Sequence, residues 1–378
     1  MSGLPLIGIL GARGTAGQAC VQALLRDTSF TLRLGGRDAE RGAVHTAQLG
    51  SRVHFVPVDI QDAQALKNFV RGCQLVINCA GPSRLILDTV ARAALQAGCH
   101  YLDLAGDEVL YQRTEDLHAT LYQKRLCCLL SIGIFPGLSG LFLDYCLQEG
   151  DSRAQDTSLF FANCGEAMSQ TAALDIVYSL RDGFGLGMHR LQHGQVVRDN
   201  AGPQLVNLPF LRESLALYPS LNYECQRVAT RRRTPNLRCC VSMPSHTMQT
   251  LFQIRAAESW QHPTEVEQSA RQLAAASLLD CKDFSPFTWY QVKAKGEQNG
   301  EYWHLDAELI WNKPSVQLVG RMIAITVQMI ISEHYLPGRY LFHESLDIPE
   351  FFRLLTSGEG APRLSLHMNT ESLEIGYI

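Results

Sequence analysis

The strongest constraint on the fold lies near the start of the chain, in the stretch LIGILGARGTAGQAC from Leu6 to Cys20. An apolar run passes into Gly11, Gly14 and Gly17, spaced by three residues, and then into a helical pattern. In a Rossmann βα unit the first glycine permits the tight turn, the second lets the backbone approach a pyrophosphate, and the third allows close helix packing. An ordinary strand-to-helix turn is the alternative, but a second strand follows about twenty residues later, as the fingerprint requires. The stretch therefore predicts a dinucleotide site.

The second strand indicates which dinucleotide is bound. An NAD enzyme usually ends this strand with an acidic residue that accepts from the ribose 2′-OH, whereas this chain reads Leu34-Gly-Gly-Arg-Asp38. Arg37 stands where a 2′-phosphate would lie, Gly36 leaves room for it, and Arg13 adds a second guanidinium. Asp38 is either the ribose acceptor or a helix N-cap, and the Asp-Ala-Glu-Arg sequence favours the cap. We therefore expect NADP(H) rather than NAD(H).

The ends of later strands complete the expected cofactor site. VPVDIQD places a carboxylate near the adenine, and VINCAGP closes the fourth strand with a small-residue turn that can approach the ribose and nicotinamide. The residues that we expect to bind the cofactor are Gly11, Arg13, Gly14, Thr15, Ala16, Gly17, Gly36, Arg37, Asp59, Ile60, Cys79, Ala80, Gly81, Pro82 and Gly106.

The fifth strand carries an acidic residue inside its apolar run, in HYLDLAGDE. Asp103 lies at the carboxyl edge of the expected sheet, where ligands bind in this architecture. Two roles are open for it. The carboxylate could hold backbone N–H groups of the following loop, or it could stabilise a cationic nitrogen of a substrate. We take Asp103 as the candidate catalytic residue.

The pattern of strands and helices divides the chain. The predicted strands of the first domain are 5–11, 30–35, 53–58, 74–79, 99–104 and 127–134, and the predicted helices are 16–26, 62–71, 84–97 and 108–125. This alternation predicts an α/β Rossmann domain with a doubly wound parallel sheet over 1–148. An α+β substrate and dimerisation domain with a mainly antiparallel sheet is expected over 149–314. A helical C-terminal segment, 315–378, is expected to return to the first domain.

The second domain is expected to contain long strands. The alternating runs are TSLFFANC, LRCCVS, TLFQIRAA, FTWYQVKAKG and EYWHLDAELIW, and the last two surround the hairpin signal Glu297-Gln-Asn-Gly300. Helical patterns lie near 170–181 and 263–279. A sheet of this kind can supply the contact of a symmetric homodimer.

Composition excludes several classes of protein. A net charge of −4 without a basic stripe argues against a nucleic-acid partner. The twelve cysteines form no Cys-x-x-Cys pair and show no ligand spacing with histidines, so we expect no metal and a reducing, cytoplasmic compartment. The uncharged segment 126–143 is divided by glycines and Pro136, which favours a strand, a turn and a helix over a membrane span. A small molecule is the expected partner.

With these pieces assembled, the chain resembles the saccharopine dehydrogenase-like family of NADP-binding oxidoreductases, especially the saccharopine reductase type. The resembling motifs are GARGTAG, LGGRD, VPVDIQD, VINCAGP, GCHYLDLAGD and GIFPGLSG, in that order within about the first 145 residues. The resemblance implies a Rossmann domain followed by a substrate domain that often carries the dimer contact. It also implies hydride transfer at a carbon–nitrogen bond of an amino-acid-derived molecule.

Two alternatives accompany this interpretation. Some relatives resemble trans-acting enoyl reductases, and the run Arg231-Arg-Arg233 could dock an acidic carrier protein. The second alternative is a protein that binds NADP(H) without catalysing a reaction. The first domain has no Tyr-x-x-x-Lys pair of the short-chain dehydrogenase kind. A dicarboxylate substrate would need arginines in the second domain, for which Arg181 and Arg190 are candidates.

Overall fold

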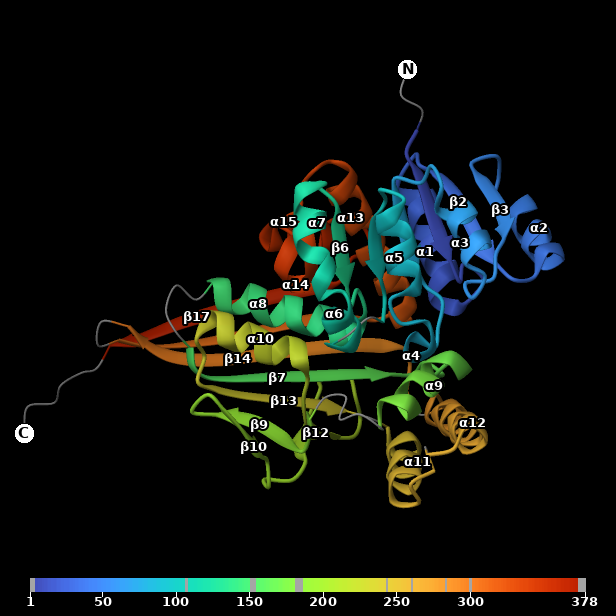
Figure 1. Ribbon diagram of the computed structural model, residues 1–378. Coiled ribbons are helices and arrows are strands. Elements are labelled where there is room, and N and C mark those ends of the chain that lie inside the picture. The colour runs from blue at the N-terminus through green and yellow to red at the C-terminus, as the bar shows by residue number, and fades with distance from the viewer. Residues whose placement is uncertain are drawn as a thin grey trace, which may run out of the picture. The chain divides into compact units, whose positions relative to one another are not determined.

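The computed structural model, drawn in Figure 1, describes residues 4–105, 108–149, 154–180, 186–242, 244–259, 261–282, 284–298 and 301–372. The chain forms two compact units. The first contains residues 1–138 and 316–355, and the second contains residues 139–315 and 356–378. The predicted fold class, a doubly wound parallel sheet followed by a domain with a mainly antiparallel sheet, is confirmed.

The first unit is built on a seven-stranded sheet in the order β16-β6-β5-β4-β1-β2-β3, and every pairing in it is parallel. Its strands are β1 (Leu6–Leu10), β2 (Thr31–Gly36), β3 (Val53–Pro57), β4 (Leu75–Asn78), β5 (His100–Asp103), β6 (Cys127–Leu130) and β16 (Gly338–Leu341). The strands β4 and β6 are buried at every residue, as expected for a parallel sheet covered on both faces.

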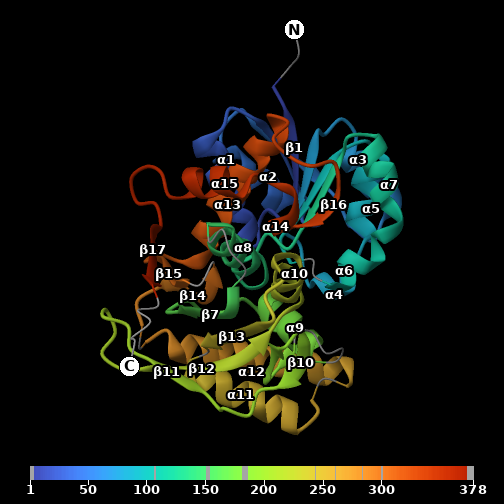
Figure 2. The same ribbon diagram turned by 90° about the vertical axis from the view of Figure 1, so that its left-hand side faces the viewer.

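Helices cover both faces of this sheet. They are α1 (Thr15–Asp27), α2 (Ala39–Ala47), α3 (Ala63–Val70), α4 (Ser83–Ile86), α5 (Thr89–Gln96), α6 (Glu108–Arg113), α7 (His118–Gln123), α13 (Ser315–Ile331), α14 (Phe342–Ser345) and α15 (Ile348–Leu355). Figure 2 shows α1, α13 and α15 on one side of the sheet and α3, α5 and α7 on the other. The long apolar helix α13 contacts its neighbours on that side, because Gln328 donates to the carbonyl of Asp27 at the end of α1 (3.0 Å) and Arg321 donates to that of Leu355 in α15 (2.9 Å).

The second unit is built on a ten-stranded sheet. Its strands are β7 (Ala154–Cys164), β8 (Leu186–Gly187), β9 (His189–Gln192), β10 (Gln195–Arg198), β11 (Gln204–Val206), β12 (Leu215–Leu221), β13 (Asn236–Ser242), β14 (Phe287–Gln298), β15 (Glu301–Trp311) and β17 (Arg363–Ser372). The main path is β10-β9-β13-β7-β14-β15-β17, and only β13 and β7 pair in parallel. The predicted hairpin is β14–β15.

The helices of the second unit form two groups. They are α8 (Ser139–Glu149), α9 (Gln170–Ser179), α10 (Tyr223–Arg232), α11 (Ser245–Ala256) and α12 (Pro263–Asp280). Figure 1 shows α8 and α10 side by side over β14 and β7. The other three pack together around an apolar core that includes Val177, Ile254 and Leu273.

Two sequence predictions about secondary structure are wrong in detail. TLFQIRAA, predicted as a strand, lies in α11 up to Ala256, because Met248, Leu251 and Ile254 are spaced by three and turn toward the core. The C-terminal segment 315–378, predicted as a helical segment that returns to the first domain, does so over residues 316–355, which include nearly all of α13. It also supplies a seventh strand, β16, to the first sheet and an edge strand, β17, to the second. β16 has only four residues, too few for a periodic pattern, whereas the alternation of Leu364, Leu366 and Met368 in β17 was overlooked.

The division between units falls before α8 rather than after residue 148. The segment 126–143 does form a strand, an irregular turn at 134–138 and the start of a helix, as predicted. Within the described residues, no helix has the length and apolar character that crossing a membrane would require.

Candidate cofactor site

The three glycines after β1 have different steric surroundings. Gly11 has a φ of 71°, and a Cβ there would lie 2.5 Å from the backbone nitrogen of Ala80. A Cβ on Gly17 would lie 2.2 Å from the carbonyl oxygen of Gly11. A Cβ on Gly14 would meet only that same oxygen, at 3.3 Å. Gly11 and Gly17 are therefore required by packing, whereas Gly14 presents an open backbone face.

This open face continues into the N-terminus of α1. Gly14 caps the helix in an extended conformation without a side-chain hydrogen bond. Thr15 is exposed and Ala16 is half-buried, so first-turn N–H groups are accessible to an anion. This cradle of small residues fits the pyrophosphate of a dinucleotide.

The end of β2 fits the 2′-phosphate of NADP(H). Arg37 is exposed and forms no hydrogen bond or ion pair with any of the described residues. Asp38 caps α2 by accepting from the N–H of Arg41 (3.0 Å), which confirms the prediction of a helix cap. Arg13 lies 3.6 Å from the Asp38 carboxylate, so the two predicted guanidiniums belong to one surface. A Cβ at Gly36 would make only ordinary contact with the Phe55 ring, so its small size leaves room rather than relieving a clash.

The next strand ends supply the remaining predicted residues. Asp59 is exposed after β3 and accepts from the N–H of Gln61 (3.0 Å), while Ile60 is half-buried. After β4, Cys79 donates its N–H to Leu10 (2.9 Å), which brings the Cys79–Pro82 turn beside β1. A hydrogen bond between the thiols of Cys79 and Cys20, and then burial, raise the pKa of Cys79 well above its usual range. Cys79 is therefore a neutral thiol.

Asp103 is buried at the end of β5, with 2% of its surface exposed. Its Oδ1 accepts from the N–H of Ala105 (2.9 Å), and its Oδ2 accepts from Asn78 Nδ2 (3.1 Å) and from the Tyr101 hydroxyl. Burial, and then the charge of Asp103, raise the pKa of Tyr101 well above its usual range, so Tyr101 stays a donor. The loop-holding role considered for Asp103 is thus present, and a direct role toward a substrate stays a prediction.

Sequence reasoning missed Asn78 and Tyr101. The available signal was a single amide at the end of the otherwise apolar run LVIN, next to the turn predicted to approach the nicotinamide. The predicted cofactor residue Gly106 lies outside the described residues.

In the second unit, the arginine run considered for carrier docking is largely engaged within the chain. Asp144 is fully buried in α8 and accepts from Arg231 and, at 2.6 Å, from Arg232 of α10. Arg233 ends α10 in a left-handed conformation. Two of the three arginines therefore join helices α8 and α10.

Of the two arginines considered for a dicarboxylate, Arg190 is half-buried in β9 and donates to Gln192 (2.9 Å). Arg181 lies outside the described residues.

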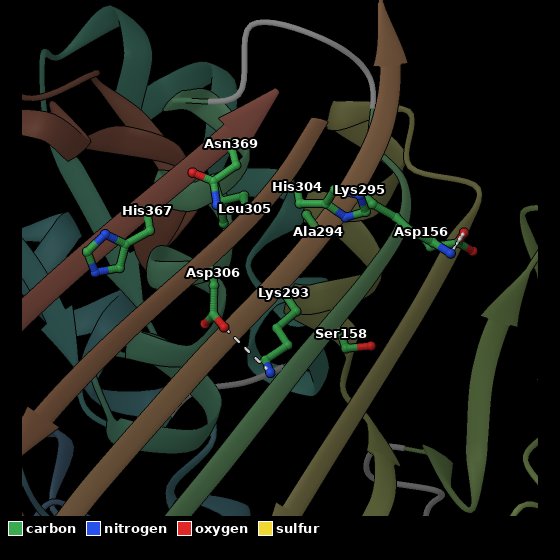
Figure 3. Close-up of a pocket in the computed structure, with 10 residues that line it drawn as sticks. All are labelled: Asp156, Ser158, Lys293, Ala294, Lys295, His304, Leu305, Asp306, His367 and Asn369. Carbon is green, nitrogen blue, oxygen red and sulfur yellow. Dashed lines mark ion pairs between the residues drawn. The ribbon is translucent and has the colours of Figure 1, made fainter. Parts of the chain in front are cut away.

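The second unit also has an open cavity of about 300 Å³ on its sheet, lined by side chains of β7, β14, β15 and β17. Figure 3 shows Lys293 pointing toward Asp306, with 3.5 Å between the charged atoms, and Ser158 near them. Lys295 pairs with Asp156 in the same way, at 3.4 Å. The cavity is thus a polar part of the sheet surface. Among the described residues, no group of three or more His, Cys, Asp or Glu side chains could hold a metal ion.

Residues 7–127 match the family model described as the saccharopine dehydrogenase NADP binding domain. This part of the chain is thus similar to the NADP-binding domain of that family. The match supports NADP(H) binding by the first unit, in agreement with the open glycine turn and with Arg37.

Two further comparisons agree. A probable mitochondrial saccharopine dehydrogenase-like oxidoreductase from Arabidopsis thaliana is 30% identical over 120 residues, which are 28% of this chain and 26% of that protein. The chain thus matches about a quarter of that relative's length. The apo histidine-tagged saccharopine dehydrogenase (L-Glu forming) from Saccharomyces cerevisiae aligns with 97% of this chain and 100% of its own, with a TM-score of 0.69 and 12% identity, which shows a shared fold.

Proposed function

We propose that the protein is an NADP(H)-dependent oxidoreductase that transfers hydride to or from a carbon–nitrogen bond, imine or amine, of an amino-acid-derived small molecule. The observation that carries the proposal is that both units, and not only the NADP-binding domain, share the fold of a saccharopine dehydrogenase. A cofactor domain alone would leave the substrate open, because many functions use the same fold.

The proposed reaction depends more on the positioning of substrate and cofactor than on general acid–base catalysis. Bound NADPH would supply the hydride. An iminium carbon already accepts hydride readily, so the contribution of the chain is to hold the two reactants in register and to exclude water. The open turn at Gly14, the first turn of α1 and Arg37 would bind the phosphates. The Cys79–Pro82 turn would face the nicotinamide half.

A trans-acting enoyl reductase that serves a carrier-bound intermediate is the second candidate. Its strongest sequence support is the arginine run at 231–233. Because Arg231 and Arg232 are bonded to the buried Asp144, we favour a free small molecule over a carrier-bound substrate.

A panel assay separates these functions. NADPH oxidation is followed with cyclic and amino-acid-derived imines and, in parallel, with enoyl thioesters. Turnover of imines is the expected result. Turnover of enoyl thioesters alone would replace the proposal with the second candidate. Tight NADPH binding with no turnover of either class would indicate a binding protein without catalysis.

We also propose that the protein acts in the cytoplasm, because all twelve cysteines are free thiols, which suits a reducing compartment. Fractionation of cells that produce a tagged chain tests the compartment.

A further inference from the structure

The carboxyl ends of β4 and β5 are joined by a buried pair of side chains. Asn78 and Asp103 are the last residues of these strands and are register partners in the parallel pairing. Asn78 Nδ2 donates to Asp103 Oδ2 at 3.1 Å. The two residues are 3% and 2% exposed. A buried charge and amide are costly unless all their groups are bonded, so this pair has a defined arrangement.

The second oxygen of each side chain holds the loop that follows its own strand. Asn78 Oδ1 accepts from the N–H of Ala80 (3.2 Å), and Asp103 Oδ1 accepts from the N–H of Ala105 (2.9 Å). Ala80 is also the residue against which Gly11 packs, since a Cβ on Gly11 would lie 2.5 Å from its nitrogen. The pair therefore fixes the loop after β4 relative to both the glycine turn and the loop after β5.

We propose that Asn78 and Asp103 are positioning residues that set the shape of the subsite for the nicotinamide half of NADP(H). The adenine and 2′-phosphate half is held elsewhere, by Gly14 and Arg37 at β1 and β2. The proposal rests on the cofactor assignment and not on the identity of the substrate. A pair that served stability alone would be replaceable by packed apolar side chains, which are often as stable as a buried polar pair.

The geometry allows a test by exchange of the two residues. In Asn78→Asp, the carboxylate at position 78 faces the carboxylate of Asp103, and the two repel each other. In Asp103→Asn, the new amide either points its NH₂ group at the NH₂ group of Asn78 or rotates, which leaves the loop N–H of Ala105 without an oxygen acceptor. In the double variant Asn78→Asp/Asp103→Asn, the amide introduced on β5 donates to the carboxylate introduced on β4, while both loop N–H groups keep an oxygen acceptor. Tyr101 can then accept from the second amide hydrogen. The exchange thus restores the bond between the two strand ends, with its donor direction reversed, and both loop hydrogen bonds, whereas the Tyr101 hydroxyl hydrogen loses its acceptor.

Two ligands report on the two halves of the site. NADPH spans both, whereas adenosine 2′,5′-bisphosphate lacks the nicotinamide riboside. We expect each single variant to bind NADPH about tenfold more weakly and to bind the bisphosphate within about twofold of the wild type, as measured by calorimetry. The double variant should recover NADPH affinity. Tyr101→Phe, which removes one hydroxyl from the same network, should show the same split with a smaller loss and is informative if a single exchange fails to fold.

The possible outcomes are distinct. If the single variants bound NADPH and the bisphosphate equally more weakly, and their melting temperatures fell as well, the pair would be merely structural and the proposal would be overturned. Wild-type NADPH affinity in the single variants would overturn it as well. Failure of the wild-type protein itself to bind NADPH would instead remove the cofactor assignment, and this inference with it.

Discussion

The open face of Gly14 leads to a prediction that separates cofactor binding from folding. The substitution is Gly14→Val. In the fold, a Cβ at this position meets only the Gly11 carbonyl at 3.3 Å, and the backbone has a φ of −69° and a ψ of 164°, which valine adopts readily. Glycine is preferred over valine at an N-cap by up to about 1 kcal/mol, and the smaller conformational entropy of valine in the unfolded chain offsets part of this cost, so the free energy of unfolding should change by about 1 kcal/mol or less.

The cofactor, in contrast, should bind much more weakly. The isopropyl group would occupy the place where the pyrophosphate approaches the backbone, removing about two charge-assisted hydrogen bonds. Each contributes roughly 1.5–3 kcal/mol, so the affinity for NADPH should fall by a factor of about 10²–10⁴. The matched control is Gly17→Ala, where the new Cβ lies 2.2 Å from a backbone oxygen. It should destabilise the fold by about 1–3 kcal/mol or more.

Fluorescence titration with NADPH and urea denaturation measure the two effects on the same samples. Wild-type protein should gain about 2.7 kcal/mol of stability at an NADPH concentration of 100 times its Kd, and Gly14→Val should gain at most about 0.4 kcal/mol at the same concentration. If Gly14→Val retained tight NADPH binding, the glycine turn would not be the pyrophosphate site.

The other predictions concern separate parts of the chain. NADPH should bind at least about tenfold more tightly than NADH, and Arg37→Asp should reverse this preference; equal affinities in a fluorescence titration would refute it. Burial lowers the pKa of His100 from 6.5 to about 4, so its contribution to stability is complete above pH 6.5 and is lost as the pH falls toward 4, by about 3 kcal/mol. His100→Gln should flatten that part of the stability curve in urea denaturation. Arg232→Ala leaves the buried Asp144 with one partner fewer and should cost about 2–4 kcal/mol in urea denaturation, whereas a carrier-docking arginine would leave stability unchanged. We also propose that the sheet of the second unit forms a homodimer contact, which light scattering at micromolar concentration tests and a strictly monomeric mass would contradict.

The parts of the site that follow from local sterics could be predicted from the sequence. A glycine turn between a strand and a helix has few conformations, so the spacing together with the following strand predicts the packing roles of Gly11 and Gly17, which the structure shows, and leaves Gly14 open toward the expected pyrophosphate. The cap at Asp38 also depends only on residues within one helical turn. These predictions need no knowledge of how distant segments meet.

The parts that depend on register between distant segments could not be predicted. Asn78 and Asp103 become partners only through the β4–β5 pairing, and Asp144 of α8 lies 88 residues before Arg232 of α10, with which it pairs. In each case the sequence shows a polar residue in an apolar run but not its partner. For Asp103, this leaves a loop-holding role and a substrate role equally open.

The first unit separates the residues that would touch the phosphates from those that hold their supports. Gly14 and Arg37 are exposed, and a substitution at either site has few neighbours to disturb. Gly17, Asn78 and Asp103 are buried, and each is bonded or packed against backbone atoms of the loops. Cofactor preference can therefore change through exposed residues at little cost in folding free energy. A substitution in the buried set instead moves the loops first and changes the cofactor affinity as a consequence. Across the variants, we therefore expect substitutions of exposed residues to change Kd with little change in melting temperature, and substitutions of buried residues to change both.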